Sequence, residues 1–196
     1  MNIGRIITAL HPNNDYRPIH SLYTQQILMH IEQRAFCERV KNLFPDKFTN
    51  QDVLEIGSQN INGSIRELFT GGKYLGIDLG SGKDVDLVCH GKDYYREIPF
   101  DVIVSCESLE HDEFYAATIV NAIRLLKGGG LLLMTMASFG RPEHGTHDSA
   151  AFASPHTLNY YGNVCLKDVA HLCEWERLFS HFRSNMEECR ICISTE

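Results

Sequence analysis

The chain has 196 residues, of which 43% are hydrophobic and 22% charged, so its composition is that of a globular domain and excludes a disordered, collagenous or coiled-coil chain. Its 18 basic and 25 acidic residues give a net charge of −7, which argues against nucleic acid as a partner. Because there is neither an apolar run of the roughly 18 residues that a membrane span requires nor a secretory signal pattern, we expect a single-domain cytoplasmic protein without a membrane partner.

The first 50 residues predict a helical extension. Apolar residues such as Leu22, Ile27 and Ile31 recur at helical spacing from Ser21 to Phe44, and Pro45 ends the run. We therefore divide the chain into an extension at 1–50 and a main domain at 51–196.

From Asp52 onward, short apolar runs alternate with helical stretches. Five strands are predicted at Val53–Ile56, Tyr74–Ile77, Val85–Cys89, Phe100–Ser105 and Leu131–Met136. Three helices are predicted at Ile61–Phe69, Glu113–Leu126 and Leu166–Phe179. Strands that are apolar on both faces and separated by helices indicate a doubly wound, Rossmann-like α/β fold with a mainly parallel sheet.

The last two predicted strands, Phe182–Glu187 and Cys189–Ser194, are joined by a short connection. We expect them to form an antiparallel hairpin at one edge of the sheet. In a doubly wound sheet, ligands bind beyond the carboxyl ends of the strands, near the point where the strand order reverses. Function is therefore to be sought directly after each strand.

A glycine turn follows the first predicted strand of the main domain. The strand carries Glu55 near its end and turns through Gly57 and Ser58, with a second glycine at Gly63. A nicotinamide dinucleotide would require G-x-G-x-x-G at this place, and the sequence lacks that spacing. A turn that is poor in glycine and led by a carboxylate suits a ligand with an ammonium group.

A second acidic residue, Asp78, ends the next strand 23 positions after Glu55. A carboxylate at this place accepts hydrogen bonds from both hydroxyls of a ribose, and its charge repels a 2′-phosphate. An isolated aspartate is more often a solvated turn residue, but its combination with Glu55 and the glycine turn predicts a nucleoside site.

Four segments in this order resemble the successive motifs of the class I S-adenosylmethionine-dependent methyltransferases: VLEIGSQNINGS, YLGIDLG, FDVIVSCESLEHD and RLLKGGGLLLMTM. Within that family, the sequence is most similar to the subgroup typified by the quinone-biosynthesis methyltransferases. The resemblance implies a seven-stranded sheet whose last strand is antiparallel and S-adenosylmethionine as cofactor. Its motifs do not specify the methyl acceptor, which we expect to be a small or medium-sized molecule. The alternative is an inactive S-adenosylmethionine-binding partner or regulatory protein.

The resemblance also implies roles for individual residues. It assigns the methionine part of the cofactor to the glycine turn, the ribose to the end of the next strand, the adenine to the loop that follows, and the central cleft to the end of the fourth strand. These groups are, in turn, Glu55, Ile56, Gly57, Ser58 and Gly63; Asp78 and Leu79; His90 and Gly91; and Ser105, Cys106 and Glu107. The chain departs from the family where Gln59 and Ile61 replace glycines, and where His90 replaces an acid or amide.

Three histidines are candidates for catalysis, because a hydroxyl or amine acceptor must lose a proton to a nearby base. His111 follows the fourth strand, and His144 and His147 lie in the aperiodic stretch 138–163, which suggests an acceptor-site wall. For each, the alternative is a histidine that merely faces water. A metal site at His144, His147 and Asp148 is disfavoured because such loops have no fixed geometry, and no metal is expected.

Overall fold

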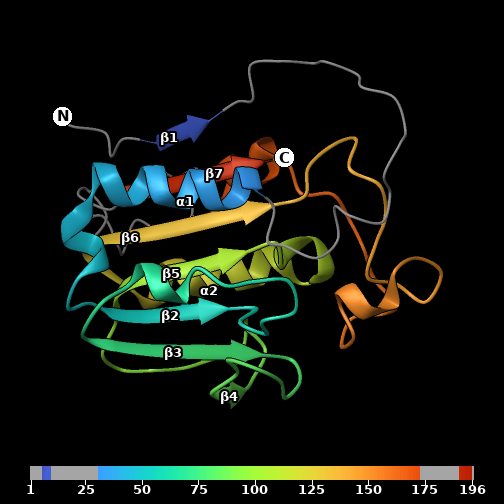
Figure 1. Ribbon diagram of the computed structural model, residues 1–196, viewed down its shortest axis with the longest axis horizontal. Coiled ribbons are helices and arrows are strands. Elements are labelled where there is room, and N and C mark those ends of the chain that lie inside the picture. The colour runs from blue at the N-terminus through green and yellow to red at the C-terminus, as the bar shows by residue number, and fades with distance from the viewer. Residues whose placement is uncertain (1–5, 10–30, 173–189, 196) are drawn as a thin grey trace.

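The computed structural model describes residues 6–9, 31–172 and 190–195 of the chain. Its centre is a parallel sheet of five strands, as the sequence predicts: β2 (Asp52–Ile56), β3 (Lys73–Asp78), β4 (Leu87–Val88), β5 (Phe100–Cys106) and β6 (Leu126–Met136). Two short strands, β1 (Ile6–Ala9) and β7 (Arg190–Thr195), continue the sheet beyond β6, and the order is β1-β7-β6-β5-β2-β3-β4 (Figure 1).

The strand order reverses between β2 and β5. From β2 the chain runs outward through β3 to β4 and then returns to place β5 and β6 on the other side of β2. Because all these strands are parallel, their carboxyl ends meet at one edge, beyond which the loop of residues 138–163 extends (Figure 1). This edge is where a doubly wound sheet binds its ligand.

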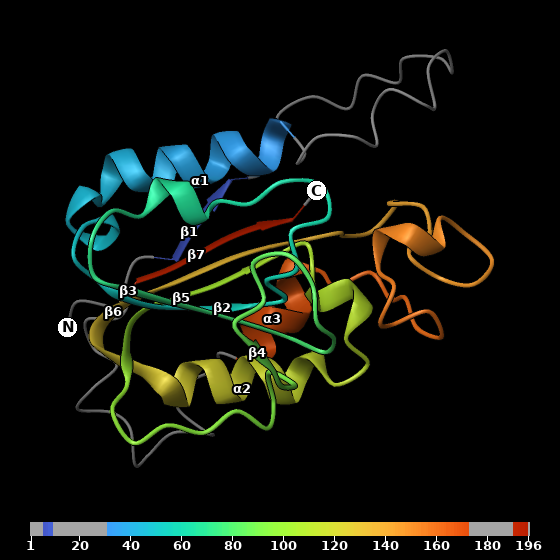
Figure 2. The same ribbon diagram turned by 60° about the horizontal axis from the view of Figure 1, so that its bottom comes forward.

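Helices cover both faces of the sheet. The helix α1 (Ile31–Leu43) lies on one face, and α2 (Tyr115–Leu125) and α3 (Leu166–Leu172) lie on the other (Figure 2). Successive strand residues alternate between the two cores, so Val102 and Val104 pack on the α1 side while Ile103 packs on the α2 side. Apolar residues on both faces therefore produce the doubly wound arrangement.

The predicted helix at Ile61–Phe69 is wrong, because only a single 3₁₀ turn, η2 (Arg66–Leu68), forms there. Polar side chains bond to the local backbone instead. The Asn60 side-chain oxygen accepts a hydrogen bond from the Gly63 N–H at 3.1 Å, and the Ser64 hydroxyl accepts one from the Arg66 N–H at 3.0 Å. Such bonds offer the backbone an alternative to helix formation.

The boundaries of the other elements differ from expectation in smaller ways. Helix α2 begins two residues later than predicted, since Asp112 accepts a hydrogen bond from the Phe114 N–H at 2.7 Å and so shapes the turn before the helix. Strand β6 begins five residues before the predicted start, at Leu126. The first part of the predicted helix at 21–44 and the end of that at 166–179 lie outside the described residues.

The predicted antiparallel hairpin is not confirmed. Its first strand, at 182–187, lies outside the described residues, and the second, β7, pairs in parallel with both β6 and β1. The short stretches η1 (Pro45–Phe48), η3 (Leu109–His111) and η4 (Ala151–Ala153) are 3₁₀ turns in the connections. Within the described ranges, no helix has both the length and the apolar character that crossing a bilayer requires.

Candidate functional site

The glycine turn joins the ends of three neighbouring strands. The N–H groups of Gly57 and Ser58 both donate to the Ile77 carbonyl of β3, at 2.9 and 3.1 Å. Gly57 has a φ of 77°, and a β-carbon there would lie 2.1 Å from the hydroxyl oxygen of Ser108, which follows β5. Only glycine fits a backbone that is both left-handed and this close to a neighbour.

Glu55 lies two residues before Gly57, in β2, and is 5% exposed. Its carboxylate accepts a hydrogen bond from the Tyr74 hydroxyl at 3.0 Å. Burial raises the pKa of Glu55 to about 7, although the Tyr74 hydrogen bond and the charge of Arg66 oppose that rise. Val53, two residues earlier in β2, packs in the core on the α1 side. Because alternate residues of a strand point to the same face, Glu55 projects toward the α1 face of the sheet as well.

Asp78 ends β3 beside the glycine turn. Its two carboxylate oxygens accept hydrogen bonds from the N–H groups of Gln59 at 3.0 Å and Leu79 at 2.7 Å. A carboxylate has about four lone-pair positions, so two remain for a ligand. The backbone of the two loops fixes the direction of this side chain, as a ribose site requires.

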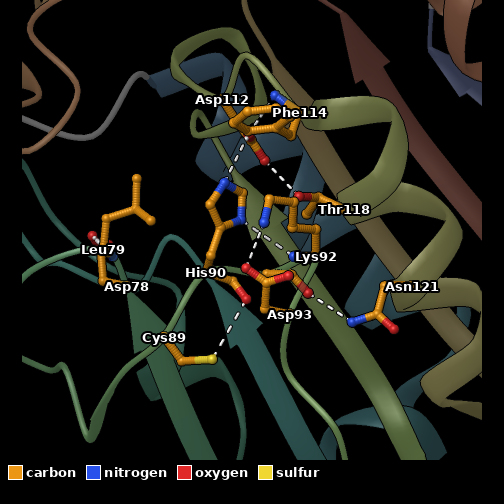
Figure 3. Close-up of polar contacts among 11 residues, drawn as sticks. Asp78, Leu79, Cys89, His90, Lys92, Asp93, Asp112, Phe114, Thr118 and Asn121 are labelled. Atoms are coloured by element: carbon orange, nitrogen blue, oxygen red, sulfur yellow. Dashed lines mark hydrogen bonds and ion pairs between the residues drawn. The ribbon is translucent and has the colours of Figure 1, made fainter.

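The predicted adenine position is organised around His90 (Figure 3). Its Nδ1 accepts a hydrogen bond from the Lys92 N–H at 3.2 Å, and its Nε2 lies 3.3 Å from an oxygen of Asp112. The ring meets Phe114 edge to face, with centroids 5.7 Å apart. Because both ring nitrogens have partners, the side chain offers a ring face rather than a hydrogen bond.

Neighbouring polar groups hold this loop in place (Figure 3). Asp112 also accepts a hydrogen bond from the Thr118 hydroxyl of α2 at 2.5 Å. The Asn121 amide, which is on the same helix, donates to the carbonyl of Gly91 at 2.7 Å. The loop after β4 is therefore anchored to α2, and a ligand would meet a preformed surface there.

The end of β5 places its predicted residues in different surroundings. Ser105 is buried, and its hydroxyl oxygen has no hydrogen-bond partner in the described part of the chain. Cys106 packs with the core on the α1 side, where hydrogen bonding to Cys37 and burial raise the pKa of its thiol well above the usual value. Ser105 thus has a hydroxyl group that could bond to a ligand, whereas Cys106 belongs to the core on the α1 side.

A buried polar cluster follows β5 at the same edge of the sheet. Glu107 has a φ of 49°, and Glu110 has no exposed surface. All four of their carboxylate oxygens are buried without a hydrogen-bond partner among the residues that the structure describes. Burial raises the pKa of both carboxyls, and the charge of Glu107 raises that of Glu110 further, while the charge of Arg141 opposes both shifts.

Two of the predicted catalytic histidines meet in this cluster. The rings of His111 and His144 have centroids 5.0 Å apart, and Tyr161 packs against both, at 5.5 and 4.9 Å. Burial, with a smaller contribution from His144, lowers the pKa of His111 to about 4, and burial also lowers the pKa of His144. Both imidazoles are therefore neutral at pH 7 and available as a base or a ligand.

His147 lies apart from the other two histidines. Its side chain is exposed, and its backbone N–H donates to the Leu158 carbonyl at 3.0 Å, which closes the loop on itself. His156, from the same loop, reaches back across the edge of the sheet, because a β-carbon on Gly80 would lie within 2.2 Å of its ring. The loop at 138–163 thus extends from the histidine pair to the end of β3.

A surface groove of about 740 Å³ lies elsewhere, between α1 and the segment at 60–67. Its lining includes Arg34, Glu38, Asn60 and Arg66, and of the predicted cofactor residues only Gly63 reaches it. The groove therefore does not coincide with the carboxyl ends of the central strands, and Gly63 lies in its lining whereas Gly57 does not.

The buried cluster also contains Glu110 and Tyr161, which were not among the predicted site residues. Glu110 lies in the turn η3, three residues after Glu107, so its place directly after the fourth predicted strand was the available signal. Nothing local to Tyr161 points to the cluster, because its hydroxyl bonds to Asn163 close by and only its ring meets the distant His111 and His144.

A family model described as a methyltransferase domain matches residues 28–181 of the chain. No curated protein matches the chain significantly.

Proposed function

Because the chain belongs to the methyltransferase-domain family, we propose that it transfers a methyl group from S-adenosylmethionine to a small or medium-sized acceptor. The observation that carries the proposal is the position of Asp78, whose carboxylate is fixed by two backbone N–H groups beside the glycine turn. Asp78 ends β3, next to β2, so it lies beside the point between β2 and β5 where the strand order reverses and where a doubly wound sheet takes its ligand. The likeness to the quinone-biosynthesis enzymes remains part of the proposal.

The adenosyl part of the cofactor would bind between the loops after β3 and β4. The free lone pairs of the Asp78 carboxylate would accept hydrogen bonds from the two ribose hydroxyls. The same carboxylate would repel a ribose that carries a 2′-phosphate, because both groups are negatively charged. The adenine would stack on the face of His90, since both ring nitrogens of that histidine already have partners. Leu79, which is 39% exposed, supplies apolar surface beside the ribose.

The methionine part would lie along the glycine turn, with Glu55 as the acid nearest its ammonium group. Supporting this role, the carboxyl of Glu55 is buried, and its pKa of about 7 reflects the cost of ionising it there. A positive charge close by favours the ionised form, so the cofactor and the carboxylate would stabilise each other.

Methyl transfer from a sulfonium is an in-line displacement on an already activated carbon. The oxygen, nitrogen or carbon of the acceptor forms a bond to the methyl carbon, and the carbon–sulfur bond breaks with its electron pair going to sulfur. The protein contributes mainly by holding the acceptor atom about 3 Å from the methyl group and in line with that bond. His111, His144 and His147 remain the candidates to contact the acceptor.

The proposal is tested by calorimetry with the purified chain. We expect S-adenosylhomocysteine to bind with a stoichiometry of one and NAD not to bind, and we expect incubation with S-adenosylmethionine and trial acceptors to give a product heavier by one methylene unit. Binding of S-adenosylhomocysteine without any transfer across a broad acceptor panel would favour an inactive binding protein. Absence of binding would overturn the proposal.

A further inference from the structure

The buried cluster after β5 brings together three side chains of kinds that bind metal ions. One ligand atom each from Glu110, His111 and His144 lie within 4.8 Å of one another. The three side chains come from two segments that the fold brings together, the turn η3 and the loop after β6. A single ion could therefore contact all three.

The burial of these groups is costly unless something compensates it. Glu110 has no exposed surface, and neither of its carboxylate oxygens has a hydrogen-bond partner among the described residues. The two carboxylate oxygens of Glu107 and Nδ1 of His111 also have no hydrogen-bond partner among the described residues, and His111 as a whole is 7% exposed. Buried polar groups in folded proteins are almost always hydrogen-bonded, paired or bound to a metal. A cation at the centre of the cluster would satisfy several of them at once.

The surroundings of His144 match those of a metal ligand. Its Nδ1 lies 3.0 Å from the Pro142 carbonyl, so Nδ1 carries the proton and Nε2 presents a lone pair. Histidines that bind metals typically donate their other ring N–H to a carbonyl or carboxylate in this way. Tyr161 packs against both imidazole rings and fixes their orientation.

Close packing also holds the loop against His111. A β-carbon on Gly145 would lie 2.7 Å from a ring carbon of His111, and Gly145 has a φ of 70°. Glycine therefore lets the backbone beside His144 approach the second imidazole closely enough for the two rings to share a ligand.

We propose that Glu110, His111 and His144 bind a divalent first-row transition-metal ion, with Glu107 supplying a second negative charge. Two imidazoles with a carboxylate favour Mn²⁺, Fe²⁺, Co²⁺ or Zn²⁺ over Mg²⁺ and Ca²⁺, which prefer oxygen ligands throughout. The carboxylates of Glu107 and Glu110 balance the charge of the ion. This assignment departs from the expectation of no metal, which considered only His144, His147 and Asp148.

The ion would lie beside the proposed cofactor turn, because Ser108, between Glu107 and Glu110, contacts Gly57. Three protein ligands leave a coordination position open. An acceptor hydroxyl bound to the ion would lose its proton to solvent more readily. Its oxygen would then form the bond to the methyl carbon while the methyl–sulfur bond breaks with its electron pair going to sulfur. This role rests on the proposed function, whereas the metal site itself does not.

The test is metal binding by the full chain after treatment with a chelator. We expect one Mn²⁺ or Co²⁺ per chain by calorimetry, and a Co²⁺ absorption spectrum without the charge-transfer band of a thiolate ligand, which excludes binding to cysteine. Glu110→Gln and His144→Asn should each weaken Co²⁺ binding by at least about tenfold, since even outer partners of metal sites contribute about 10–100-fold. His147→Asn, in the same loop but exposed, is the matched control and should bind Co²⁺ as the parent chain does.

Binding of S-adenosylhomocysteine in the presence of chelator separates this inference from the proposed function and shows that each variant is folded. Intact S-adenosylhomocysteine binding without stoichiometric Co²⁺ or Mn²⁺ binding would overturn the metal site alone. An equal loss of Co²⁺ affinity in His147→Asn, or no loss in Glu110→Gln and His144→Asn, would overturn it as well. Co²⁺ binding that follows the predicted pattern in a chain that does not bind S-adenosylhomocysteine would leave the metal site standing and contradict the proposed function.

Discussion

The hydroxyl oxygen of Ser108 lies 2.1 Å from the position that a β-carbon on Gly57 would occupy. Two loops, after β2 and after β5, are in direct contact there, on either side of the point where the strand order reverses. The contact ties the proposed cofactor turn to the turn that carries Glu107, Glu110 and His111. A change at Gly57 should therefore disturb both.

We predict that Gly57→Ala lowers the free energy of unfolding by about 2–4 kcal/mol, because it adds a steric clash to an unfavourable positive φ. Urea denaturation measures the change. Gly140→Ala is the matched control, since Gly140 has a φ of 92° but nothing within 4 Å of a β-carbon, and should cost only about 1–2 kcal/mol. Combining Gly57→Ala with Ser108→Gly should recover the steric part, and a double variant as unstable as the single one would contradict this account.

The buried carboxyl of Glu55 predicts a pH-dependent stability. Its pKa is about 7 in the folded chain against 4.5 ordinarily, so the folded state binds more protons between these values. The contribution of Glu55 to the free energy of unfolding is most favourable below pH 4.5 and is lost as the pH rises through about 7. Glu55→Gln removes the cost of ionising a buried carboxyl, and the glutamine side chain still offers an oxygen to the Tyr74 hydroxyl.

Glu55→Gln should therefore be more stable than the parent chain at pH 8, by up to about 3 kcal/mol at about 1.4 kcal/mol per pKa unit, and nearly equal to it at pH 5. Urea denaturation of both chains at the two pH values checks this, without cofactor. The interpretation of Glu55 as a desolvated carboxyl would be wrong if the variant were the less stable chain at pH 8. Tyr74, Arg66, Asp84 and Asp78 also act on this carboxyl, and the substitution leaves them in place.

We predict that Asp78→Asn weakens binding of S-adenosylhomocysteine by about 1.5–3 kcal/mol, or roughly 10–150-fold, because the ribose loses hydrogen bonds to a charged group. The asparagine oxygen can still accept from one of the two backbone N–H groups, which limits damage to the loop. Calorimetry measures the affinity. Asp93→Asn, on an exposed side chain paired with Lys92, is the control and should leave the affinity unchanged.

The stacking role of His90 predicts a difference between two substitutions. His90→Ala should weaken binding of S-adenosylhomocysteine by about 1–3 kcal/mol, the usual value for losing an aromatic partner of a base. His90→Phe keeps the ring and should lose much less, although it gives up the contacts with Asp112 and Lys92. Equal losses in the two variants, measured by the same titration, would show that the ring nitrogens rather than the ring face matter.

Much of the sheet could be predicted because its strands are short, apolar on both faces and bounded by glycine or polar residues. The strand at Leu131–Met136 is an example, since its residues are buried throughout and only its early start at Leu126 was missed. The helix predicted at Ile61–Phe69 failed for a local reason, because Asn60 and Ser64 bond to the backbone in competition with a helix. The parallel pairing of β7 could not be predicted from its own sequence, because it depends on β1 and β6, which lie far away along the chain.

The candidate site could be predicted only where motif and strand end coincide. Gly57 and Asp78 follow buried strands, so their meeting at one edge follows from the parallel sheet. His111 and His144 were both predicted as catalytic candidates, but their direct contact and that of Tyr161 could not be derived, since His144 and Tyr161 lie in a loop without periodicity. Even Cys106, the last residue of β5, packs into the core because the pleat directs it toward α1.

A crystal structure of the chain with S-adenosylhomocysteine tests the central claim most directly. We predict that both ribose hydroxyls lie within hydrogen-bonding distance of the Asp78 carboxylate, with the adenine against His90 and the sulfur near Gly57. A ligand bound instead in the groove between α1 and the segment at 60–67, or one whose ribose does not touch Asp78, would contradict it.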